Sequence, residues 1–179
     1  MKGLLWQPGR LGPVELRNRT IRSATNEHLS QPDGQLTQAW AETLAELARN
    51  EVGLVITGHL CVDRTQRADE GQPVLDSQTD RTLLAQAAEE VHRAGGRIAA
   101  QLSHSGKKAM EAVNGRPAKA RRTSPPEELD RLVDSSAWGD SYAGKLALTR
   151  SRSTPPTDTC CPISSTPKKI SVRTSTAAA

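Results

Sequence analysis

The chain has 179 residues, 24 Lys and Arg against 20 Asp and Glu, and a formal net charge of +4, a length that allows one domain with a real core. Apolar residues make up 35% of the chain, with no Phe and one Tyr, so its core must be nearly all aliphatic. No stretch approaches the roughly 18 uninterrupted apolar residues of a membrane span. Residues 1–13 lack the apolar run of a secretory signal, which favours a cytoplasmic protein.

The charge is unevenly distributed along the chain. Residues 1–134 contain 18 Lys and Arg and 18 Asp and Glu, whereas residues 135–179 contain 6 and 2. The second part therefore carries the whole net charge, and we expect a domain over 1–134 followed by a tail over 135–179. Three Cys are too few for a disulfide framework, and no Cys or His spacing indicates a zinc site, so we expect no metal.

The first elements in chain order are short strands and a helix. Residues 12–16 are expected to form an edge strand after the Pro8-Gly9 turn, and residues 19–25 form a short β-prone run. Residues 34–50 carry Leu36, Trp40, Leu44 and Leu47 at the spacing of one helix face. Thr37 is a plausible N-cap for this helix.

Strand and helix patterns then alternate. The continuous apolar run over 53–58 is typical of a strand buried on both faces, and a long loop over 63–78 follows it. Residues 80–94 are predicted to form a second helix that stops at Gly95-Gly96, and residues 97–102 the next strand. The order strand–helix–strand–helix–strand predicts a parallel sheet with right-handed crossovers. A capping box at Ser124–Glu127 predicts a third helix.

The last segment, residues 151–179, is dominated by Ser, Thr and Pro and shows no apolar period. This composition predicts a disordered tail. The alternative is a basic arm for nucleic acid, because Lys168, Lys169 and Arg173 are clustered. No aromatic residues interleave those charges and no nucleic-acid-binding signature is present, so we expect no nucleic-acid partner.

Polar residues follow the predicted strands where each strand ends, which is the ligand side of parallel α/β folds. Gln101 places an amide at the end of a buried strand, where it needs partners from a ligand or from neighbouring backbone. Gly58 admits close approach of a ligand, or simply makes a tight strand end. His28, His59 and His104 lie in the same loops, but none has a visible acid or nucleophile as partner, so they define no reaction. The candidate positions are Ser23, Ala24, Thr25, Asn26, Thr57, Gly58, Gln101 and His104.

Several ordered motifs between residue 16 and residue 133 resemble the Old Yellow Enzyme family of NADH:flavin oxidoreductases. The resemblance covers the chain from Met1 to about Asp134. The motifs that carry it are Leu16-Arg17-Asn18-Arg19, Arg22-Ser23-Ala24-Thr25, Asp33-Gly34 with Thr37, residues 53–58 with Val62, residues 91–96, residues 101–107, residues 115–118 and residues 124–133.

This resemblance implies an α/β fold, a partial TIM (β/α)₈ barrel with about the first three βα units. It also implies FMN as cofactor, NAD(P)H as reductant and a small α,β-unsaturated substrate. By the same likeness, Ser23, Ala24 and Thr25 would touch the flavin, Gly58 would face the ring edge and Gln101 would bond the pyrimidine portion. Asn26 would lie near the ring where the family often has Thr or Cys, and Lys107 replaces the commoner Arg of its motif.

The family pattern stops after about residue 134, whereas a closed barrel of this class needs about 250 residues and builds its phosphate site after strands seven and eight. We therefore expect a truncated oxidoreductase, in an active or an inactive form. The alternative is a non-enzymatic barrel remnant that does not bind flavin stably and associates with itself through open sheet edges. No catalytic acid and no substrate-binding His can be assigned.

The tail suggests a cause for the truncation. Residues 152–162, back-translated with AGA for Arg152 and read from the last base of that codon, can spell I-H-A-A-H-G-Y-L-L-S, which resembles a family segment. The hypothesis is that a frameshift near Ser135 or Ser136 produced the tail over 135–179. Sequencing the gene tests it, because a one-base change should restore the family reading downstream.

Overall fold

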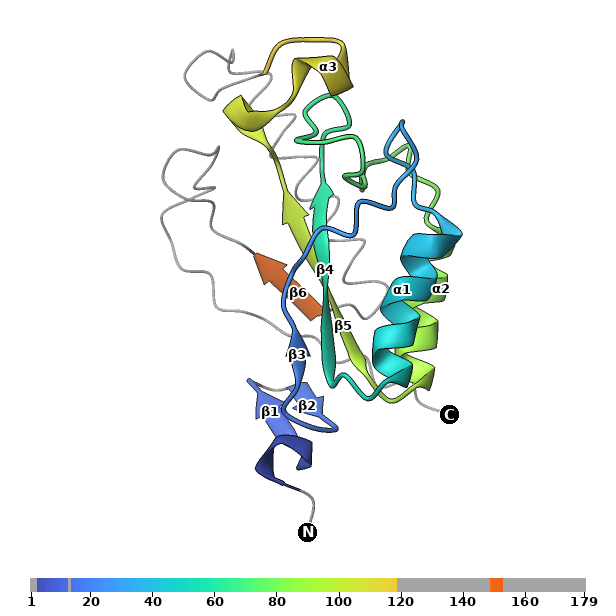
Figure 1. Cartoon of the computed structure of the whole chain (residues 1–179), viewed down its shortest axis with the longest axis vertical. Coiled ribbons are helices and arrows are strands. Elements are labelled where there is room, and N and C mark those ends of the chain that lie inside the picture. The colour runs from blue at the N-terminus through green and yellow to red at the C-terminus, as the bar shows by residue number, and fades with distance from the viewer. Residues whose placement is uncertain (1–2, 13, 119–148, 153–179) are drawn as a thin grey trace.

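The protein is described by a computed structural model that covers residues 3–12, 14–118 and 149–152. Its elements follow one another as an N-terminal hairpin and then alternating strands and helices (Figure 1). The helices are η1 (Leu4–Trp6), α1 (Gln38–Arg49), α2 (Thr82–Arg93), η2 (Gly106–Lys108) and α3 (Glu111–Asn114). The strands are β1 (Gly9–Leu11), β2 (Val14–Leu16), β3 (Ile21–Arg22), β4 (Leu54–Cys61), β5 (Arg97–Ser103) and β6 (Thr149–Arg152).

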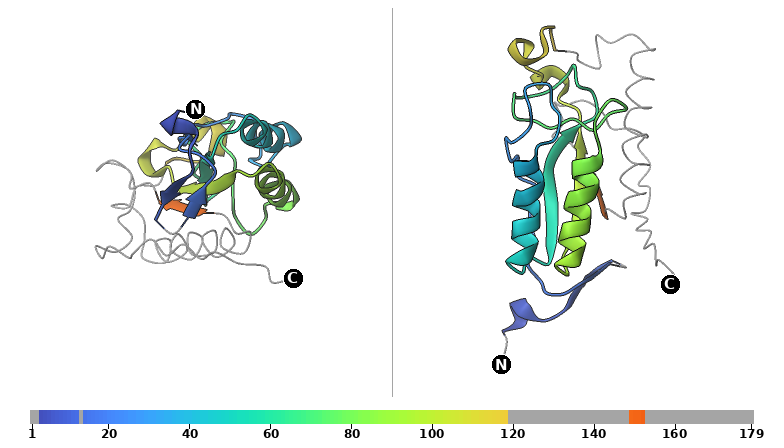
Figure 2. Two further views of the ribbon diagram at one scale, coloured as in Figure 1. Left: turned by 90° about the horizontal axis from the view of Figure 1, so that it is seen from below. Right: turned by 90° about the vertical axis from the view of Figure 1, so that its right-hand side faces the viewer.

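Four strands form a parallel sheet in the order β3-β4-β5-β6. The helices α1 and α2 run side by side along one face of this sheet (Figure 2). The antiparallel β1–β2 hairpin lies at the amino ends of the parallel strands (Figure 1). The described strands therefore make a partial, parallel α/β unit, and they do not close into a barrel.

Two apolar clusters lie on opposite faces of the sheet. The larger one packs α1 and α2 on β4 and β5 and includes Trp40, Leu44, Leu84 and Val91, none of which is exposed. The smaller one lies on the other face, beside the hairpin, and consists of Val14, Leu16, Leu54 and Ala99, with Ile56 against it. Because both faces are covered along β4, its sequence reads as a continuous apolar run.

Both predicted helices are confirmed, with shorter bounds. Thr37 caps α1, because its hydroxyl accepts a hydrogen bond from the backbone N–H of Trp40 at 3.1 Å. The second helix ends before Gly95, which has a φ of 79°, a left-handed conformation that favours glycine.

The strand predictions need two corrections. Pairing of β3 is limited to Ile21 and Arg22, shorter than the predicted 19–25. The strand predicted to end at Gly58 continues to Cys61, and its register to β5 shifts between Ile56 and His59. The cause is a β-bulge, which places Gly58 inside the strand and lets pairing resume beyond it.

The segment predicted to be a disordered tail contains a described strand. Residues 149–152 form β6 and pair in parallel with β5, although their sequence shows no apolar alternation. The remainder of the predicted tail, and the helix predicted from Ser124, lie outside the described residues. Within the described ranges, no helix has both the length and the apolar character needed to cross a membrane.

Arg17 connects the hairpin to the ends of both long helices. Its guanidinium group donates hydrogen bonds to the backbone carbonyls of Ala48 and Ala94, and to that of Val52 at 3.2 Å. These carbonyls lie in and just beyond the last turns of α1 and α2, where helix dipoles place partial negative charge. One cation therefore anchors the hairpin beneath both helices.

Candidate functional site

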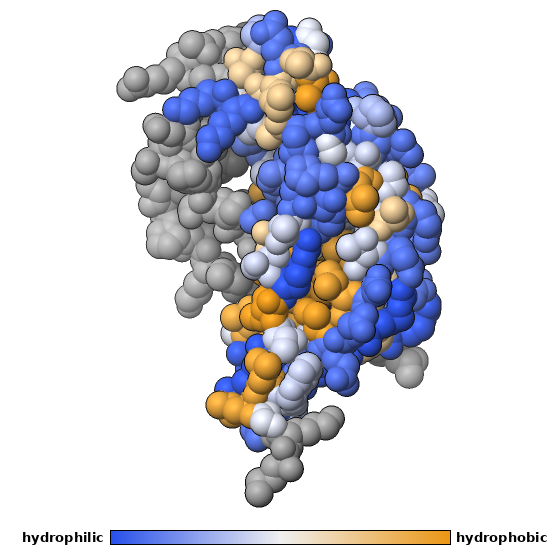
Figure 3. All heavy atoms as spheres, in the orientation of Figure 1, coloured by the Kyte–Doolittle hydropathy of each residue, from blue (hydrophilic) through white to orange (hydrophobic). Residues whose placement is uncertain are grey.

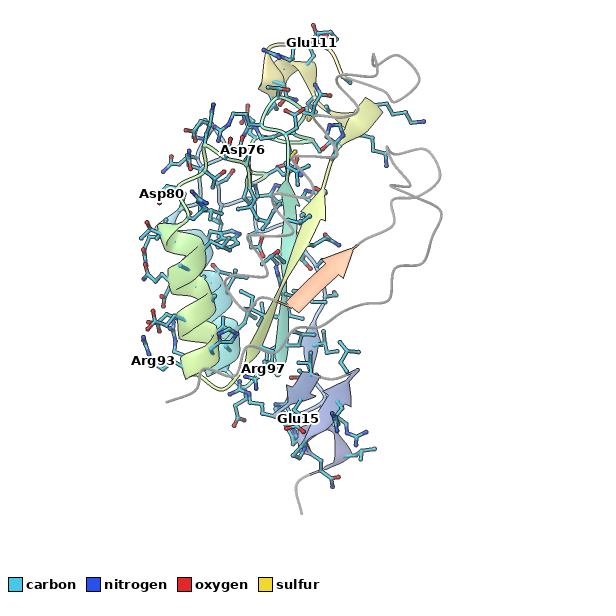
Figure 4. All side chains as sticks on the ribbon, turned by 180° about the vertical axis from the view of Figure 1, so that it is seen from behind. Glu15, Asp76, Asp80, Arg93, Arg97 and Glu111 are labelled. Carbon is cyan, nitrogen blue, oxygen red and sulfur yellow. The ribbon has the colours of Figure 1, made fainter. Side chains whose placement is uncertain are left out.

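The predicted site residues gather at the carboxyl ends of the parallel strands, where the loops lie in Figure 1. Residues 23–26 follow β3 directly, and Gln101 of β5 pairs with His59 of the neighbouring strand β4. The loops after β4 contribute Asp76 at the same end, whereas Glu15 and Arg97 lie at the opposite end (Figure 4). The polar side chains that the sequence singled out therefore share one edge of the sheet, as expected for a ligand site.

A buried carboxylate organises the β3 side of this edge. The side chain of Glu27 is 1% exposed and accepts hydrogen bonds from Arg22 at 2.6 Å and from the backbone N–H of Gly58 at 3.1 Å. It also accepts one from the indole of Trp40 at 3.3 Å. Glu27 thus ties the loop after β3 to α1 and to the bulge of β4.

The loop after β3 packs closely against Gly58. A Cβ at Gly58 would lie 2.5 Å from Glu27 Oε2 and 2.8 Å from the carbonyl oxygen of Thr25. Gly58 does not make a strand end, because β4 continues to Cys61. Its lack of a side chain lets the loop with Thr25 and Asn26 pack directly against the strand.

Gln101 presents its amide at the same edge. Its backbone N–H donates to the hydroxyl of Thr57 at 3.1 Å, and its side chain is partly exposed. Among the described residues, no hydrogen bond to the side-chain amide is found. The amide can therefore offer one donor and one acceptor side by side to a ligand. Ser23 and Thr25 are exposed, and the Thr25 hydroxyl donates to the carbonyl of Ser23 at 3.2 Å.

Asp69, from the loop after β4, joins residues of two other segments. Its carboxylate accepts a hydrogen bond from Asn26 Nδ2 at 2.9 Å and lies 3.2 Å from His28 Nδ1. His59 Nε2 is 3.9 Å from the same carboxylate. Burial lowers the pKa of His59 below its usual value, although the charge of Asp69 opposes that shift.

His104, which is among the candidate positions from the sequence, contacts mainly groups of the protein itself. Its side chain is 10% exposed, its Nδ1 accepts a hydrogen bond from the backbone of Gly106 at 3.1 Å, and its Nε2 lies 3.9 Å from Asp63. Burial raises the pKa of the nearby Cys61 thiol to about 12, so Cys61 is not a nucleophile at neutral pH.

Sequence reasoning did not single out three polar residues that contact the site loops, namely Glu27, Asp69 and Gln72. Gln72 is buried and donates to the carbonyl of His59 and to Ser103, both at 3.2 Å. Glu27 had a detectable signal, since it stands two residues after Thr25 in a strand-end segment. Asp69 and Gln72 lie in a long polar loop, and nothing local distinguishes them from its other polar residues.

Two further features bear on ligand binding. Among the described residues, no three His, Cys, Asp or Glu side chains are grouped so that they could hold a metal ion. At the amino end, a cleft of about 730 Å³ lies between the hairpin and the end of α2, with Arg10, Arg17, Arg19 and Arg97 in its lining. The amino end of a parallel barrel serves stability rather than chemistry, as the helix contacts of Arg17 illustrate.

The described elements form an open, parallel α/β unit of the kind that (β/α) barrels repeat, with polar side chains at the carboxyl ends of its strands. The profile of the NADH:flavin oxidoreductase / NADH oxidase family matches residues 4–137, and the chain belongs to this family. A metal reductase of Desulforamulus reducens is 34% identical over 123 residues, 68% of this chain and 18% of that protein. A 4,4'-dithiodibutanoate disulfide reductase of Rhodococcus erythropolis is 32% identical over 126 residues, 68% of this chain and 30% of that protein.

Solved structures support the same fold. The old yellow enzyme homologue from Zymomonas mobilis superposes with a TM-score of 0.71 at 22% identity, covering 83% of this chain and 47% of that one. Morphinone reductase in complex with tetrahydroNAD gives a TM-score of 0.70 at 21% identity, covering 83% and 48%. The chain thus spans less than half the length of these relatives. The resemblance to the Old Yellow Enzyme family is confirmed.

Proposed function

We propose that residues 3–118 form the flavin-ring side of an FMN-dependent oxidoreductase of the Old Yellow Enzyme type. The reductant would be NAD(P)H and the substrate a small electron-poor alkene. The observation that carries the proposal is the side-chain amide of Gln101, which lies at the carboxyl end of β5 without a partner among the described residues. A flavin pyrimidine ring has an N–H donor between two carbonyl acceptors, and one amide side chain matches such an edge.

The other proposed contacts lie on the same edge of the sheet. Ser23, Ala24 and Thr25 would touch the flavin through backbone groups and the exposed hydroxyls, and Asn26 would lie beside the ring. Gly58 would face the ring edge, with its backbone N–H donated to Glu27. When bound, FMN would supply the two-electron redox chemistry between nicotinamide and substrate. The residues of this chain bind and orient the ring.

The substrate class and the cellular location are further parts of the proposal. The two relatives named above reduce a metal and a disulfide according to their names, so acceptor chemistry differs between relatives. We take an α,β-unsaturated small molecule as substrate because the structural neighbours include a 2-naphthoyl-CoA reductase and morphinone reductase. A cytoplasmic location is part of the same proposal.

A second candidate is a barrel remnant that does not hold flavin stably. The observation that favours it is the open sheet, in which β3 has one neighbour strand instead of two. Barrels of this type build their phosphate site after strands seven and eight, and the described residues contain no such strands.

The test is an FMN titration of the full chain by flavin fluorescence, followed by anaerobic addition of NADH. We expect quenching on binding and bleaching of the flavin absorbance by NADH. Gln101→Ala should weaken FMN binding about tenfold, the worth of one to two lost hydrogen bonds. Gln86→Ala, an exposed site on α2, is the matched control. A colourless chain with no quenching supports the remnant instead.

A further inference from the structure

Residues from β4 and from the loops after β3 and β4 meet at Asp69. Its Oδ1 lies 3.2 Å from His28 Nδ1, and its Oδ2 accepts a hydrogen bond from Asn26 at 2.9 Å. On its other side, Oδ2 lies 3.9 Å from His59 Nε2. The result is a carboxylate between two imidazoles, next to the residue that the family resemblance places beside the flavin ring.

The backbone around His28 is built to hold this arrangement. His28 has a φ of 54°, a left-handed conformation that non-glycine residues rarely adopt. Its backbone N–H donates to the side chain of Asn26 at 3.2 Å. Gly71 packs directly on it, since a Cβ at Gly71 would lie 2.6 Å from the Cα of His28. Strained residues held by several contacts are typical of functional sites.

The exposure of the three side chains suits proton exchange. The side chain of His28 is 64% exposed and that of Asp69 28% exposed, so His28 can exchange protons with water. His59 is 35% exposed, and its buried Nε2 makes no hydrogen bond among the described residues. The charged groups that face the cluster are Asp69 and Glu27, and Glu27 is already engaged by Arg22. Asp69 is therefore the carboxylate that faces His28 Nδ1, beside the Asn26 amide, whose Nδ2 lies 3.3 Å from the same nitrogen.

We propose that His28 is the general acid of this site and that Asp69 positions it, a role that rests on the proposed function above. An electron-poor alkene takes up a hydride, which originates from the reduced nicotinamide, and forms a new C–H bond with the electron pair left as a carbanion or enolate. The imidazolium of His28 gives its proton to that anion and becomes neutral imidazole. Water then restores the proton, so that one hydride and one proton are consumed for each alkene reduced.

The first test observes the imidazole directly. In the full chain labelled with ¹⁵N on histidine, we expect an Nδ1 signal at the chemical shift of a nitrogen that donates to a carboxylate, and this signal should disappear in His28→Ala and in Asp69→Asn. Glu70→Gln, which removes the neighbouring exposed carboxylate, is the matched control and should retain the signal. Loss of the signal in both Asp69→Asn and Glu70→Gln would contradict a specific role of Asp69.

The second test separates the two half-reactions, with 2-cyclohexen-1-one as the probe. His28→Ala should slow alkene reduction about 100-fold, as expected on loss of a general acid, and change reduction of bound FMN by NADH less than about twofold. Added imidazole should restore part of the lost rate, an effect that a purely structural role would not give. His92→Gln, on α2, should leave both steps unchanged.

The outcomes distinguish this proposal from the proposed function. If the full chain binds no FMN, or if NADH does not reduce the bound FMN, the proposed function is wrong and the role of His28 is wrong with it. A yellow, reducible chain in which His28→Ala reduces the alkene as fast as the wild type overturns the His28 proposal alone.

Discussion

At the residue scale, Asp63 links the site loops to the acid stability of the protein. Its carboxylate accepts hydrogen bonds from the hydroxyl and the backbone N–H of Thr65, at 2.7 and 2.9 Å, and faces His104. Burial raises the pKa of Asp63, but the nearby His104 and the hydrogen bonds from Thr65 outweigh burial and lower the pKa to about 2.

We predict that Asp63→Asn flattens the acid dependence of stability. The folded pKa lies below the unfolded value of about 3.9, so the stabilisation is present above about pH 4 and is lost as the pH falls toward 2. Urea unfolding between pH 7 and pH 2 measures it. The wild type should lose stability as the pH falls from about 4 toward 2, and the control variant Glu70→Gln should show the same loss. An unchanged slope in Asp63→Asn would contradict the assignment.

Single residues also show where sequence reasoning stops. The polar edge with Ser23, Thr25 and Gln101 could be predicted, because strand ends in a parallel sheet converge. The partners of that edge could not. Glu27 is buried only because Gly58 and Arg22 enclose it, and Asp69 meets His28 across 41 residues. Such contacts depend on the tertiary fold, which no local pattern contains.

At the scale of elements, the helices and the strand β5 followed their patterns, whereas the lengths of β3 and β4 did not. The cap at Thr37 and the stop at Gly95 are local signals, so α1 and α2 were predicted within a few residues. The length of β4 depends on a bulge that Glu27 and Thr25 support from another segment. β6 pairs with β5 despite a polar sequence, so backbone pairing, not side-chain pattern, defines it.

The anchoring of the helix ends by Arg17 gives the prediction at this scale. Arg17→Met keeps the length of the side chain and removes the donors to Ala48, Val52 and Ala94. Hydrogen bonds to charged groups contribute about 1.5–3 kcal/mol each, so we expect a loss of about 2 kcal/mol or more in the free energy of unfolding. Urea titration followed by circular dichroism measures the loss. Arg10→Met, on the exposed hairpin strand β1, should change stability by less than about 0.5 kcal/mol, and equal effects in the two variants would refute the anchor.

At the scale of the whole molecule, apolar side chains gather at the hairpin end of the sheet (Figure 3). The exposed large residues there are Leu4 at 65%, Leu5 at 52%, Trp6 at 43%, Leu11 at 48% and Ile21 at 48%. Ile21 belongs to β3, the edge strand of the sheet. Monomeric proteins seldom leave such patches and open parallel edges uncovered. In a closed barrel every strand has two neighbours, and β3 has one among the described strands.

We therefore expect the full chain to associate with itself through this patch, and the double variant Leu4→Ser/Trp6→Gln to weaken that association. Burial of apolar area contributes about 25 cal/mol per Å², so removal of two large side chains should raise the dissociation constant at least tenfold. Sedimentation velocity over a range of protein concentrations measures it. Met110→Ser, which removes an exposed apolar residue at the site end, should leave the association unchanged. A wild-type chain that stays monomeric at high concentration would show that the patch is solvated. Equal association in the double variant would locate the contact at the open edge of β3, where main-chain pairing rather than apolar burial would join two copies.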